Sequence, residues 1–549
     1  MKFKLLIISL FLSATSLGAQ ESAFLRERTF LTTDRDSYAA GEQILCSAFS
    51  MDSPATLSGF SAIAYVELVG TEGTVATGKI GLVNGRGAGS VAIPHDVPTG
   101  NYRITAYTAC NKNEKGYDFM TGSRVISIYN TSLTAREKDA VAVVDQLSEA
   151  EAPAPMSGDV KVDIVPDGDY ITVSLTSPVD ASVSVSVFHE LGLPRYSPAS
   201  LASLIENAWD KPTTYERNAI PEYDGEIIRL KPGVPVDSLT LFLSSPGGRS
   251  DIYKGRAKDD GCVSFYTDNI FGDKDIAVVS LSSELSSGDI EIVSPFVSPE
   301  TASVPVLEIA PSMRNAIETL DAAAKIKRAF DADTLYSLLP VRKLDPMNKY
   351  QNIYIIDDYT RFATMKEVFI EYLHDIFIRR EGSRIRMDVK TLDAKGFPYY
   401  NHFAPSLILL DGVPVFDHNI IYDMDPALMK QVEIYPSYYA FGGTLFAGAA
   451  NFVTVTGDFA GTQLGRGTRI ISFKGASIPR SYSPLPADGD PSFPRRDETL
   501  YWHPAITLQK GQPLEFQVMA PSYSGTFNLV IQGLTPDGSP INIVRSFEL

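Results

Sequence analysis

The side chains that could bind a metal ion or act as acid and base lie far apart in this sequence of 549 residues. His189 is followed by Glu190 and His374 by Asp375, so each pair offers two metal ligands. Neither pair has the HExxH spacing that places a second histidine on the same helix face, as in zinc hydrolases. His374 adjoins the apolar face of a predicted helix, so we expect a structural role for it. No Gly-x-Ser-x-Gly motif is present, and a serine, histidine and acid from distant segments stay an open alternative.

Carboxylates and glycines indicate two other kinds of ligand site. Asp357 with Asp358, and Asp423 with Asp425, carry oxygen ligands of the type that Ca²⁺ takes, but both pairs lack the spacing of a D-x-D-x-D-G loop. We expect solvated turns there, with Ca²⁺ as the alternative. The glycine-rich segment 85–90 lies between two predicted strands and lacks the helix whose N-terminus would bind phosphate. We interpret it as a hairpin turn, and we predict no cofactor, no metal site and no catalytic residue.

An aromatic cluster is the clearest candidate for a binding surface. Tyr435, Tyr438, Tyr439, Phe441 and Phe446 fall within one short stretch. Tyrosine is favoured at interfaces because its ring is apolar and its hydroxyl is polar. In one interpretation the rings pack in the core of a domain, and in the other some of them face outward as an interface. In the second interpretation the interface residues are Tyr435, Tyr438, Tyr439 and Phe441.

The three cysteines are too few for a disulfide scaffold or a cysteine-rich metal site. Any pairing leaves one thiol over. Cys46 and Cys110 either bridge strands of one domain or stay as buried free thiols. Cys262 follows the turn sequence at 259–261 and begins a strand-like run, so we expect it to be a packed side chain.

The composition excludes one class of partner. The chain has 48 Lys and Arg, 66 Asp and Glu and 6 His, which is a formal charge of −18. An acidic chain without a basic stripe repels phosphate backbones, so we exclude nucleic acid. Apolar residues make up 44% and charged residues 21% of the chain, as in folded proteins, and the length predicts about three to four domains.

The first residues are typical of an export signal. Lys2 and Lys4 precede the apolar run 5–12, and small residues follow up to Ala19. This pattern defines a secretory signal peptide, and the apolar run is far shorter than the about 20 residues of a membrane-spanning helix. We therefore predict that residues 1–19 are cleaved. The protein is expected in the periplasm, at the outer membrane or on the cell surface, without a transmembrane helix.

Two periodicities organise the rest of the chain. Alternation with period 2, as in residues 101–107, predicts half-buried strands between turn signals, which indicates antiparallel β-sandwiches. Helical spacing occurs at 313–335 and again at 365–380. Thr364 and Glu367 form a capping box at the start of the second of these predicted helices.

Residues 33–42, T-D-R-D-S-Y-A-A-G-E, resemble the opening of the second macroglobulin-type domain, T-D-(K/R)-x-x-Y-x-x-G-(D/E). Residues 93–108 resemble the strand–turn–strand ending of the same domain. The resemblance implies a β-sandwich in which Gly41 permits a tight turn and Tyr38 packs at the rim. No cysteine of the chain lies in the Cys-Gly-Glu-Gln motif of thioester-bearing macroglobulins, so covalent trapping of proteases is excluded.

Three further pieces resemble, in the same order, the plug domain of TonB-dependent outer-membrane receptors. Residues 405–415 read P-S-L-I-L-L-D-G-V-P-V, residues 432–435 read V-E-I-Y, and residues 447–455 read A-G-A-A-N-F-V-T-V. The resemblance implies buried strands on both sides of a turn at 411–412. A receptor barrel needs about 22 strands, and the residues after Phe459 are too few for it, so we expect no TonB-dependent transport by this chain.

Together the two resemblances make the chain similar to exported Bacteroidota proteins that combine a macroglobulin-like domain with a plug-like domain and lack a barrel. The predicted fold is mainly β with an α+β part, in which tandem macroglobulin- or immunoglobulin-like β-sandwiches precede a plug-like α/β domain and a C-terminal β-sandwich domain. The predicted boundaries are a signal peptide at 1–19, a macroglobulin-like sandwich at 20–135, a linker at 136–157, a second sandwich at 158–230, a third sandwich at 231–300, a helical linker at 301–349, the plug-like domain at 350–459 and the C-terminal β domain at 460–549.

These features predict a non-catalytic binding or scaffold protein of the cell envelope, whose β-sandwiches present the plug-like domain as a docking surface. The expected partner is an envelope protein or a component of the outer membrane. One alternative is a hydrolase with an unrecognised site in a cleft between the plug-like and C-terminal domains. Another is a surface-secreted protein that is sorted by its C-terminal β domain.

Overall fold

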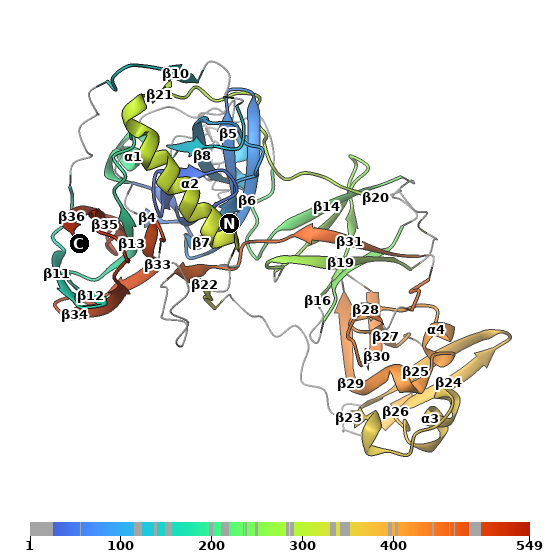
Figure 1. Ribbon diagram of the computed structural model, residues 1–549. Helices are drawn as coiled ribbons and strands as arrows, with labels where there is room; N and C mark the ends of the chain where they lie inside the picture. The colour runs from blue at the N-terminus through green and yellow to red at the C-terminus, as the bar shows by residue number, and fades with distance from the viewer. Residues whose placement is uncertain are drawn as a thin grey trace, which may run out of the picture.

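A computed structural model of the chain contains three β-sandwiches and one mixed α/β unit (Figure 1). The predicted fold class, mainly β with an α+β part, is confirmed. The predicted signal peptide lies outside the described residues. The structure describes residues 26–549 except 55, 115–122, 135, 137–139, 149–155, 197–200, 210–218, 234, 236–238, 248–250, 269, 282–284, 286–289, 330–335, 341–351, 393–397, 401–403, 442–443, 460–461, 466 and 483–495.

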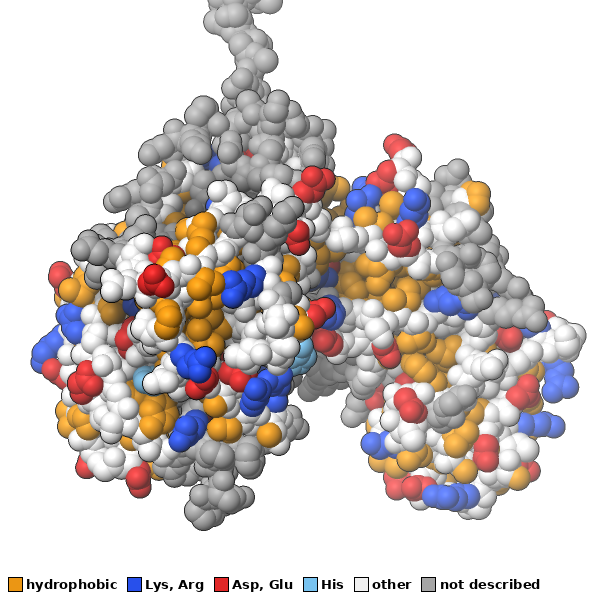
Figure 2. All heavy atoms as spheres, turned by 45° about the horizontal axis from the view of Figure 1, so that its top comes forward, with side chains coloured by type: hydrophobic (Ala, Val, Ile, Leu, Met, Phe, Trp, Pro, Cys, Tyr) orange, Lys and Arg blue, Asp and Glu red, His pale blue; other side chains and the backbone are white. Residues whose placement is uncertain are grey.

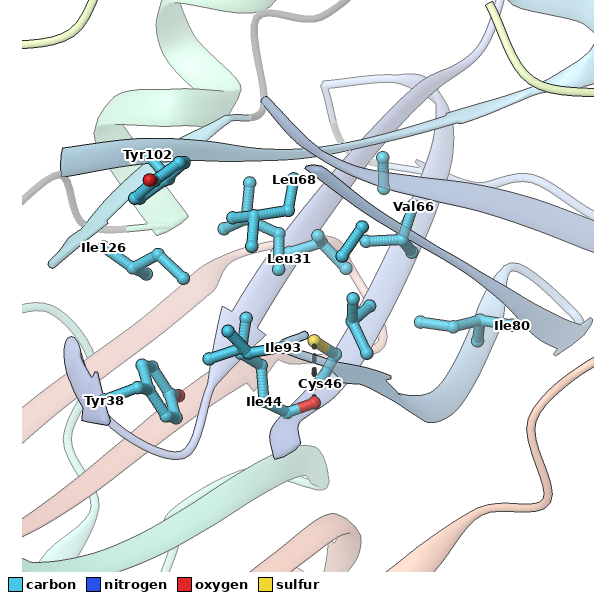
Figure 3. Packing of buried hydrophobic residues seen from close by; sticks show 14 of the residues in the cluster. Leu31, Tyr38, Ile44, Cys46, Val66, Leu68, Ile80, Ile93, Tyr102 and Ile126 are labelled. Carbon is cyan, nitrogen blue, oxygen red and sulfur yellow. Dashed lines mark hydrogen bonds between the residues drawn. The ribbon is translucent and has the colours of Figure 1, made fainter. Parts of the chain in front are cut away.

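The first sandwich is continuous in sequence and lies within the predicted macroglobulin-like domain. Strand β6 crosses from one layer to the other, because it pairs with β5 along most of its length and with β7 at its end. The core between the layers contains Leu31, Ile44 and Tyr102, all fully buried (Figure 3). Its strands are β1 Arg28–Thr33, β2 Ser37–Ala39, β3 Gln43–Ser53, β4 Thr56–Leu57, β5 Ile63–Gly70, β6 Gly73–Val83, β7 Arg86–Ala92, β8 Gly100–Thr108 and β9 Arg124–Tyr129.

The second sandwich is assembled from two distant parts of the chain. Strand β13 pairs with β33 on one side and with β35 on the other, and β12 pairs with β34. The predicted separation of a domain at 158–230 from a C-terminal domain at 460–549 is therefore wrong, because neither part alone completes a sheet or a core. The strands are β11 Lys161–Asp167, β12 Tyr170–Thr176, β13 Ala181–His189, β22 Tyr336–Leu338, β32 Arg480–Tyr482, β33 Thr499–Leu508, β34 Pro513–Met519, β35 Thr526–Leu534 and β36 Pro540–Glu548.

The third sandwich also needs a strand from far along the chain. Strand β19 pairs with β15 and with β31, which follows the α/β unit in sequence. The predicted boundaries at 231 and 300 thus exclude both β31 and most of the first strand, β14. The strands are β14 Ile227–Pro232, β15 Leu241–Ser245, β16 Asp251–Lys254, β17 Arg256–Ala257, β18 Val263–Tyr266, β19 Asp273–Ser280, β20 Ile290–Ile292 and β31 Thr468–Lys474.

The α/β unit, residues 352–459, has a five-stranded and a three-stranded sheet. The predicted capping box is confirmed, since Thr364 Oγ1 accepts from Glu367 N and the Glu367 carboxylate accepts from Thr364 N. The predicted helix at 365–380 is too long, because Ile376 and Ile378 alternate with exposed residues and pair with a neighbouring strand. The elements are β23 Asn352–Ile355, α3 Met365–Glu371, β24 Ile376–Glu381, β25 Arg384–Leu392, β26 Pro398–Tyr400, β27 Leu407–Leu410, β28 Val413–Pro414, α4 Asn419–Tyr422, β29 Met429–Phe441 and β30 Thr444–Thr454.

The two predicted linkers also contain ordered structure. Strands β10 Val141–Val143 and β21 Leu307–Ile309 pair in parallel, so they tie the segments 136–157 and 301–349 to each other. Helix α2 Arg314–Ala329 packs its buried Leu320 and Ala324 in a cluster with Tyr129 of the first sandwich. Helix α1 Leu201–Ala208 packs against β1 and β3 of the same sandwich. Short 3₁₀ turns complete the fold: η1 Ala109–Asn113, η4 Pro311–Met313, η6 Ile356–Asp358 and η7 Pro426–Leu428.

The domains are therefore nested rather than arranged in tandem. The third sandwich lies in sequence within the second, and the α/β unit lies between β20 and β31 of the third, but the chain returns to the second sandwich at β22 before it enters the unit. The first two sandwiches lie together, and the third sandwich and the α/β unit form the other part of the molecule (Figure 1). The α/β unit lies at the end of the molecule farthest from the second sandwich (Figure 1).

Candidate functional site

An apolar junction fixes the α/β unit to the third sandwich. The rings of Phe242 and Phe446 lie 6.0 Å apart, and those of Phe242 and Phe416 lie 5.7 Å apart, between centroids. Burial of apolar side chains between the α/β unit and the third sandwich holds the two parts in one orientation. Residues of both parts form one buried cluster: Phe242, Ile252, Leu407, Leu409, Phe446 and Ala449. A second cluster joins the same two parts through Ala277, Val279 and Val413.

The structure divides the predicted interface residues between this junction and the surface. Tyr435 and Tyr439 are half-buried and pack against the cluster that joins the unit to the third sandwich. Tyr438 is 40% exposed, since neighbouring residues of a strand point to opposite faces. Phe441 ends β29, and its side chain lies outside the described part of the structure. Tyr435 and Tyr439 therefore contact another domain of the same chain. This role differs from both interpretations of the sequence, which were packing in the core of one domain and an outward-facing interface.

Polar contacts orient Tyr435 from within the sheet. The carboxylate of Glu433, which is buried, accepts hydrogen bonds from Gln431 Nε2 at 2.8 Å, Tyr435 Oη at 3.0 Å and Asn451 Nδ2 at 3.1 Å. Asn451 Oδ1 in turn accepts from Gly412 N at 3.0 Å. The hydroxyl of Tyr435 is thus satisfied inside the unit, and its ring is left to contact the third sandwich.

The turn at Asp411 links the same sheet to the third sandwich. Asp411 has a φ of +46° and is buried. Its carboxylate accepts from Thr454 N at 2.7 Å, Thr454 Oγ1 at 2.6 Å and Phe459 N at 2.8 Å. Its carbonyl oxygen accepts from Gly247 N of the third sandwich at 3.2 Å. The predicted turn between two buried strands is confirmed, and the aspartate also closes the end of the unit.

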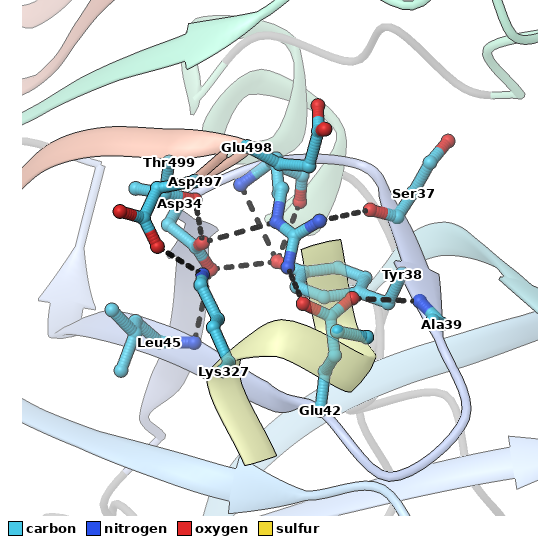
Figure 4. A network of polar contacts seen from close by, with 12 residues as sticks. Asp34, Ser37, Tyr38, Ala39, Glu42, Leu45, Lys327, Asp497, Glu498 and Thr499 are labelled. Atoms are coloured by element: carbon cyan, nitrogen blue, oxygen red, sulfur yellow. Dashed lines mark hydrogen bonds and ion pairs between the residues drawn. The ribbon is translucent and has the colours of Figure 1, made fainter. Parts of the chain in front are cut away.

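A polar junction surrounds Asp34, in the segment that resembles a macroglobulin domain (Figure 4). The buried carboxylate accepts hydrogen bonds from Tyr38 Oη at 2.8 Å, Leu45 N at 3.0 Å and Thr499 Oγ1 at 2.8 Å. The carbonyl oxygen of Asp34 accepts from Ser186 Oγ at 2.6 Å. Because Ser186 lies in β13 and Thr499 in β33, this one residue joins the first sandwich to both parts of the second.

The rest of the segment supports this arrangement. The guanidinium of Arg35 lies 4.6 Å from the centroid of the buried Tyr38 ring and pairs with the Glu42 carboxylate at 2.6 Å. Gly41 has a φ of +87°, and a Cβ atom there would lie 2.2 Å from His95 Nδ1. The predicted need for glycine in this turn is confirmed.

Burial governs the ionisation of this junction. It raises the pKa of Asp34, and the charge of Arg35 with the three hydrogen bonds opposes the shift only in part. Lys327 of α2 adds a cation, with its Nζ atom 3.7 Å from the Asp497 carboxylate. The helix, the first sandwich and the second sandwich thus meet around one set of buried charges.

A second polar junction joins the first sandwich to the third. Lys79 Nζ lies 2.6 Å from the Glu226 carboxylate and 2.7 Å from the carbonyl oxygen of Lys474 in β31. Tyr65 Oη donates to the carboxylate of Glu222, with its oxygens at 2.8 and 2.9 Å. Burial raises the pKa of Glu222 to about 7, and it also raises the pKa of Glu226 despite the nearby Lys79.

A cavity of about 670 Å³ opens beside this junction. The ammonium of Lys112 lies 4.1 Å from the centroid of the Tyr65 ring, and burial lowers the pKa of Lys112. Aromatic rings and charges of both signs line the cavity, which gives it the polarity of a site for a polar ligand. Its lining includes Tyr65, Lys112, Glu222, Arg229, Lys258 and Tyr266.

The predicted chemical groups are placed as follows. Cys46, Cys110 and Cys262 are buried free thiols, so the alternative of a bridge between Cys46 and Cys110 is excluded. Burial raises the pKa of the Cys110 thiol to about 12. Within the described residues, no three His, Cys, Asp or Glu side chains gather as a metal site would require.

The other candidate groups have structural partners. His189 Nδ1 lies 3.1 Å from the Glu498 carboxylate. The carboxylate of Asp357 pairs with Arg361, and that of Asp425 accepts from Ala427 N at 2.9 Å. Sequence reasoning missed the roles of Glu222, Glu226 and Lys79, since their partners come from other domains.

No known protein family matches the sequence, and no curated protein resembles it. Among solved structures, trypsin-activated alpha-2-macroglobulin from Escherichia coli is similar at 10% identity and a TM-score of 0.23, covering 95% of this chain and 41% of that chain. Salmonella alpha-2-macroglobulin reacted with methylamine has 8% identity and a TM-score of 0.24, covering 95% and 39%. Dimeric latent PorU from Porphyromonas gingivalis has 10% identity and a TM-score of 0.15, covering 95% and 34%.

The chain thus spans about two fifths of the length of the two macroglobulins. Scores of this size carry no information about the fold or the activity of this chain. In the part of the chain that the structure describes, no helix combines the length and the apolar character that crossing a membrane requires.

Proposed function

We propose that the chain is a non-catalytic binding or scaffold protein of the cell envelope. The three sandwiches form the support, and the α/β unit is the docking domain that this support presents. The expected partner is an envelope protein or a component of the outer membrane. The export signal predicted at residues 1–19 and the resemblance of the unit to a receptor plug support this location.

The observation that carries the proposal is the nested insertion. Strands β20 and β31 of the third sandwich enclose the α/β unit in sequence, and β13 and β33 of the second sandwich enclose the third. A domain that is tied to its support at both ends cannot swing as freely as one that ends a chain. The apolar contact of Phe242 with Phe446 adds a set orientation. Such an arrangement suits a domain that offers one constant surface to a partner.

The test is crosslinking in the native envelope. The full chain is compared with a variant in which a Gly-Ser linker replaces residues 350–459. We expect the full chain to crosslink a reproducible partner and the variant to lose it, while thermal unfolding of the sandwiches is retained. The control is Tyr223→Ser, which removes a ring that is 57% exposed outside the unit and should keep the partner. If the linker variant still crosslinks the partner, the proposal is contradicted.

A hydrolase is the second candidate, and the cavity beside Glu222 favours it. A carboxyl with a pKa of about 7 is suited to general acid or base catalysis near neutral pH. The prediction that places this site in a cleft between the plug-like and C-terminal domains is wrong, because the strands after residue 480 belong to the second sandwich (Figure 1). Turnover of a peptide, ester or glycan that is lost in Glu222→Gln would support this candidate. Inactivity of the full chain across such a panel would remove it.

A further inference from the structure

Strands β24 and β25 form a basic hairpin in an acidic protein. Residues 376–392 carry five cationic and two acidic side chains, a net charge of +3, whereas the whole chain has a charge of −18. The hairpin projects from the α/β unit at the edge of the molecule (Figure 1). The space-filling view has Lys and Arg side chains along the outer side of the same lobe (Figure 2). The charge of the hairpin is therefore opposite in sign to that of the rest of the chain.

One face of the hairpin concentrates these cations. Arg379 and Arg386 stand opposite each other in the register, a pairing of like charges that is normally unfavourable. The buried Asp388 compensates for it, since its carboxylate lies 3.2 Å from Arg379 Nε and 2.9 Å from Arg386 Nε. Phe377, on the same face, is 45% exposed, and the Arg379 guanidinium lies 5.8 Å from its ring centroid. The face thus combines an apolar ring with guanidinium groups.

Two more cations lie at the tip. Arg380 and Arg384 are exposed. Arg380 stands opposite Ile385 in the register, and Arg384 stands opposite Glu381. Guanidinium groups bind carboxylates through two parallel hydrogen bonds, and an exposed pair of them is suited to an acidic ligand.

The backbone of β25 shows which way the edge of the hairpin faces. The amides of Ile385, Met387 and Val389 donate to side chains that lie on the side away from β24: Asn419 Oδ1 at 2.8 Å, His418 Nδ1 at 2.8 Å and Ser406 Oγ at 2.7 Å. In an antiparallel ladder, a residue whose N–H points away from the neighbouring strand belongs to a non-hydrogen-bonded pair. The β25 edge is therefore closed by side chains along these three residues.

The opposite edge of the hairpin is open. Ile378 pairs with Met387 and Arg380 with Ile385, so the N–H and C=O groups of Ile378 and Arg380 point away from β25. Strand β24 is the last strand of its sheet. Among the described residues, none forms a hydrogen bond with these backbone groups. An edge strand with free backbone groups is a template for pairing with a further strand.

We propose that the outer edge of β24 receives an extended acidic segment of a partner protein as an added strand. This inference rests on the proposed docking function and assigns its surface and the chemistry of its partner. Backbone groups of Ile378 and Arg380 pair with the incoming strand, and the arginines bind its carboxylates. Phe377 supplies an apolar contact beside them. A polypeptide strand uses the backbone edge, which a lipid surface does not.

The probe is a fluorescent peptide of alternating valine and glutamate, with a valine–lysine peptide of the same length as the charge control. We expect the glutamate peptide to bind the full chain and the lysine peptide not to bind. On binding, the amides of Ile378 and Arg380 should become protected from hydrogen exchange. Equal affinity for the two peptides, or binding without this protection, overturns the proposal.

Two variants of one residue separate the backbone from the charge. Arg380→Pro removes an N–H that faces outward and keeps the ladder to β25, as proline can do on an edge strand. We expect it to weaken binding of the glutamate peptide by about tenfold or more. Arg380→Ala, which keeps the N–H, should lose clearly less affinity. Equal losses in both contradict strand addition. Circular dichroism of both variants checks that the fold is retained.

A second pair of variants tests the charge. Arg384→Glu should weaken binding of the glutamate peptide strongly. Lys510→Glu, an equal charge change at an exposed lysine of the second sandwich, should leave this binding unchanged. Equal effects would show a diffuse attraction and overturn the site. If the linker variant loses its envelope partner but Arg380→Pro keeps it, the edge inference fails and the docking function stands.

Discussion

The junctions between the domains of this molecule differ in how much buried charge they contain. The α/β unit is held on the third sandwich by rings, Phe242 and Phe446 among them. The first sandwich is held to the others by apolar contacts too, such as Leu45 with Trp502, but its junctions add buried charges such as Asp34 and the pair Lys79–Glu226. Apolar contacts are non-directional, whereas a buried charge is tolerated only with each of its partners in place. The buried charges therefore specify how the sandwiches fit, and the apolar contacts supply adhesion.

The largest expected effect is at the polar junction around Asp34. Asp34→Ala removes the acceptor of three hydrogen bonds and leaves Arg35 with Glu42 as its remaining close carboxylate. We expect a loss of about 4 kcal/mol in the free energy of unfolding of the lobe that holds the first two sandwiches. Denaturant unfolding measures it, with Asp34→Asn as the isosteric control. A loss below about 1 kcal/mol would show that the junction is dispensable.

At the junction of the α/β unit with the third sandwich, Phe446→Ala should lower the free energy of unfolding by about 3 kcal/mol, because it leaves a cavity between these two parts. The same loss is expected at pH 5 and pH 8, since no charge is involved. Limited proteolysis of the links to the unit reports its release. A loss that changes strongly with pH would break the contrast between the junctions.

The polar junction at Glu222 should respond to pH. Its folded pKa of about 7 lies above the ordinary value of 4.5, so the folded state binds the proton more tightly. The contribution to stability, on the order of 3 kcal/mol, is full below pH 4.5, falls as pH rises toward 7 and is lost above it.

Hydrogen exchange of the strands around residues 222–230 measures this local opening. Glu222→Gln should flatten the pH dependence of this local opening between pH 5 and pH 7. Neighbouring charged groups that face Glu222 are Lys112 and Glu226, and Glu226 shifts in the same direction. A profile that stays as steep in Glu222→Gln would assign the effect to these neighbours.

The smallest effect is expected within the tyrosine stretch. Tyr438→Ser should change stability by less than about 0.5 kcal/mol, because the ring is 40% exposed. Tyr435→Ser removes a ring from the junction and should cost about 1–2 kcal/mol. Thermal unfolding of the two variants side by side measures the difference. Equal losses would mean that the junction does not depend on Tyr435.

The strands themselves were predictable, whereas their partners were not. Alternation in residues 170–176 and 182–188 predicts strands, and both are present as β12 and β13. Their neighbours β33, β34 and β35 come from the end of the chain, and a local pattern carries no information about a partner so distant. The error in the helix at 365–380 has the same cause, because pairing with β25 decides the conformation of Ile376 and Ile378.

The candidate site was found by residue type but not by orientation. Tyr435 and Tyr439 stood out because aromatic residues cluster there, yet only the third sandwich determines that both are half-buried. The charges of the polar junctions gave no signal, since Lys79 and Glu226 are unremarkable until the fold brings their side chains to 2.6 Å.

By itself the sequence determined the local structure of this protein: the turn at Gly41, the turn at Asp411 and the capping box of Thr364 with Glu367. Each depends on the backbone preferences and hydrogen bonds of a few neighbouring residues. The tertiary structure alone decided the nested order of the domains, the free edge of β24 and the two kinds of junction. Sheet pairing and burial depend on groups supplied by remote parts of the chain, so their outcome exists only in the folded molecule.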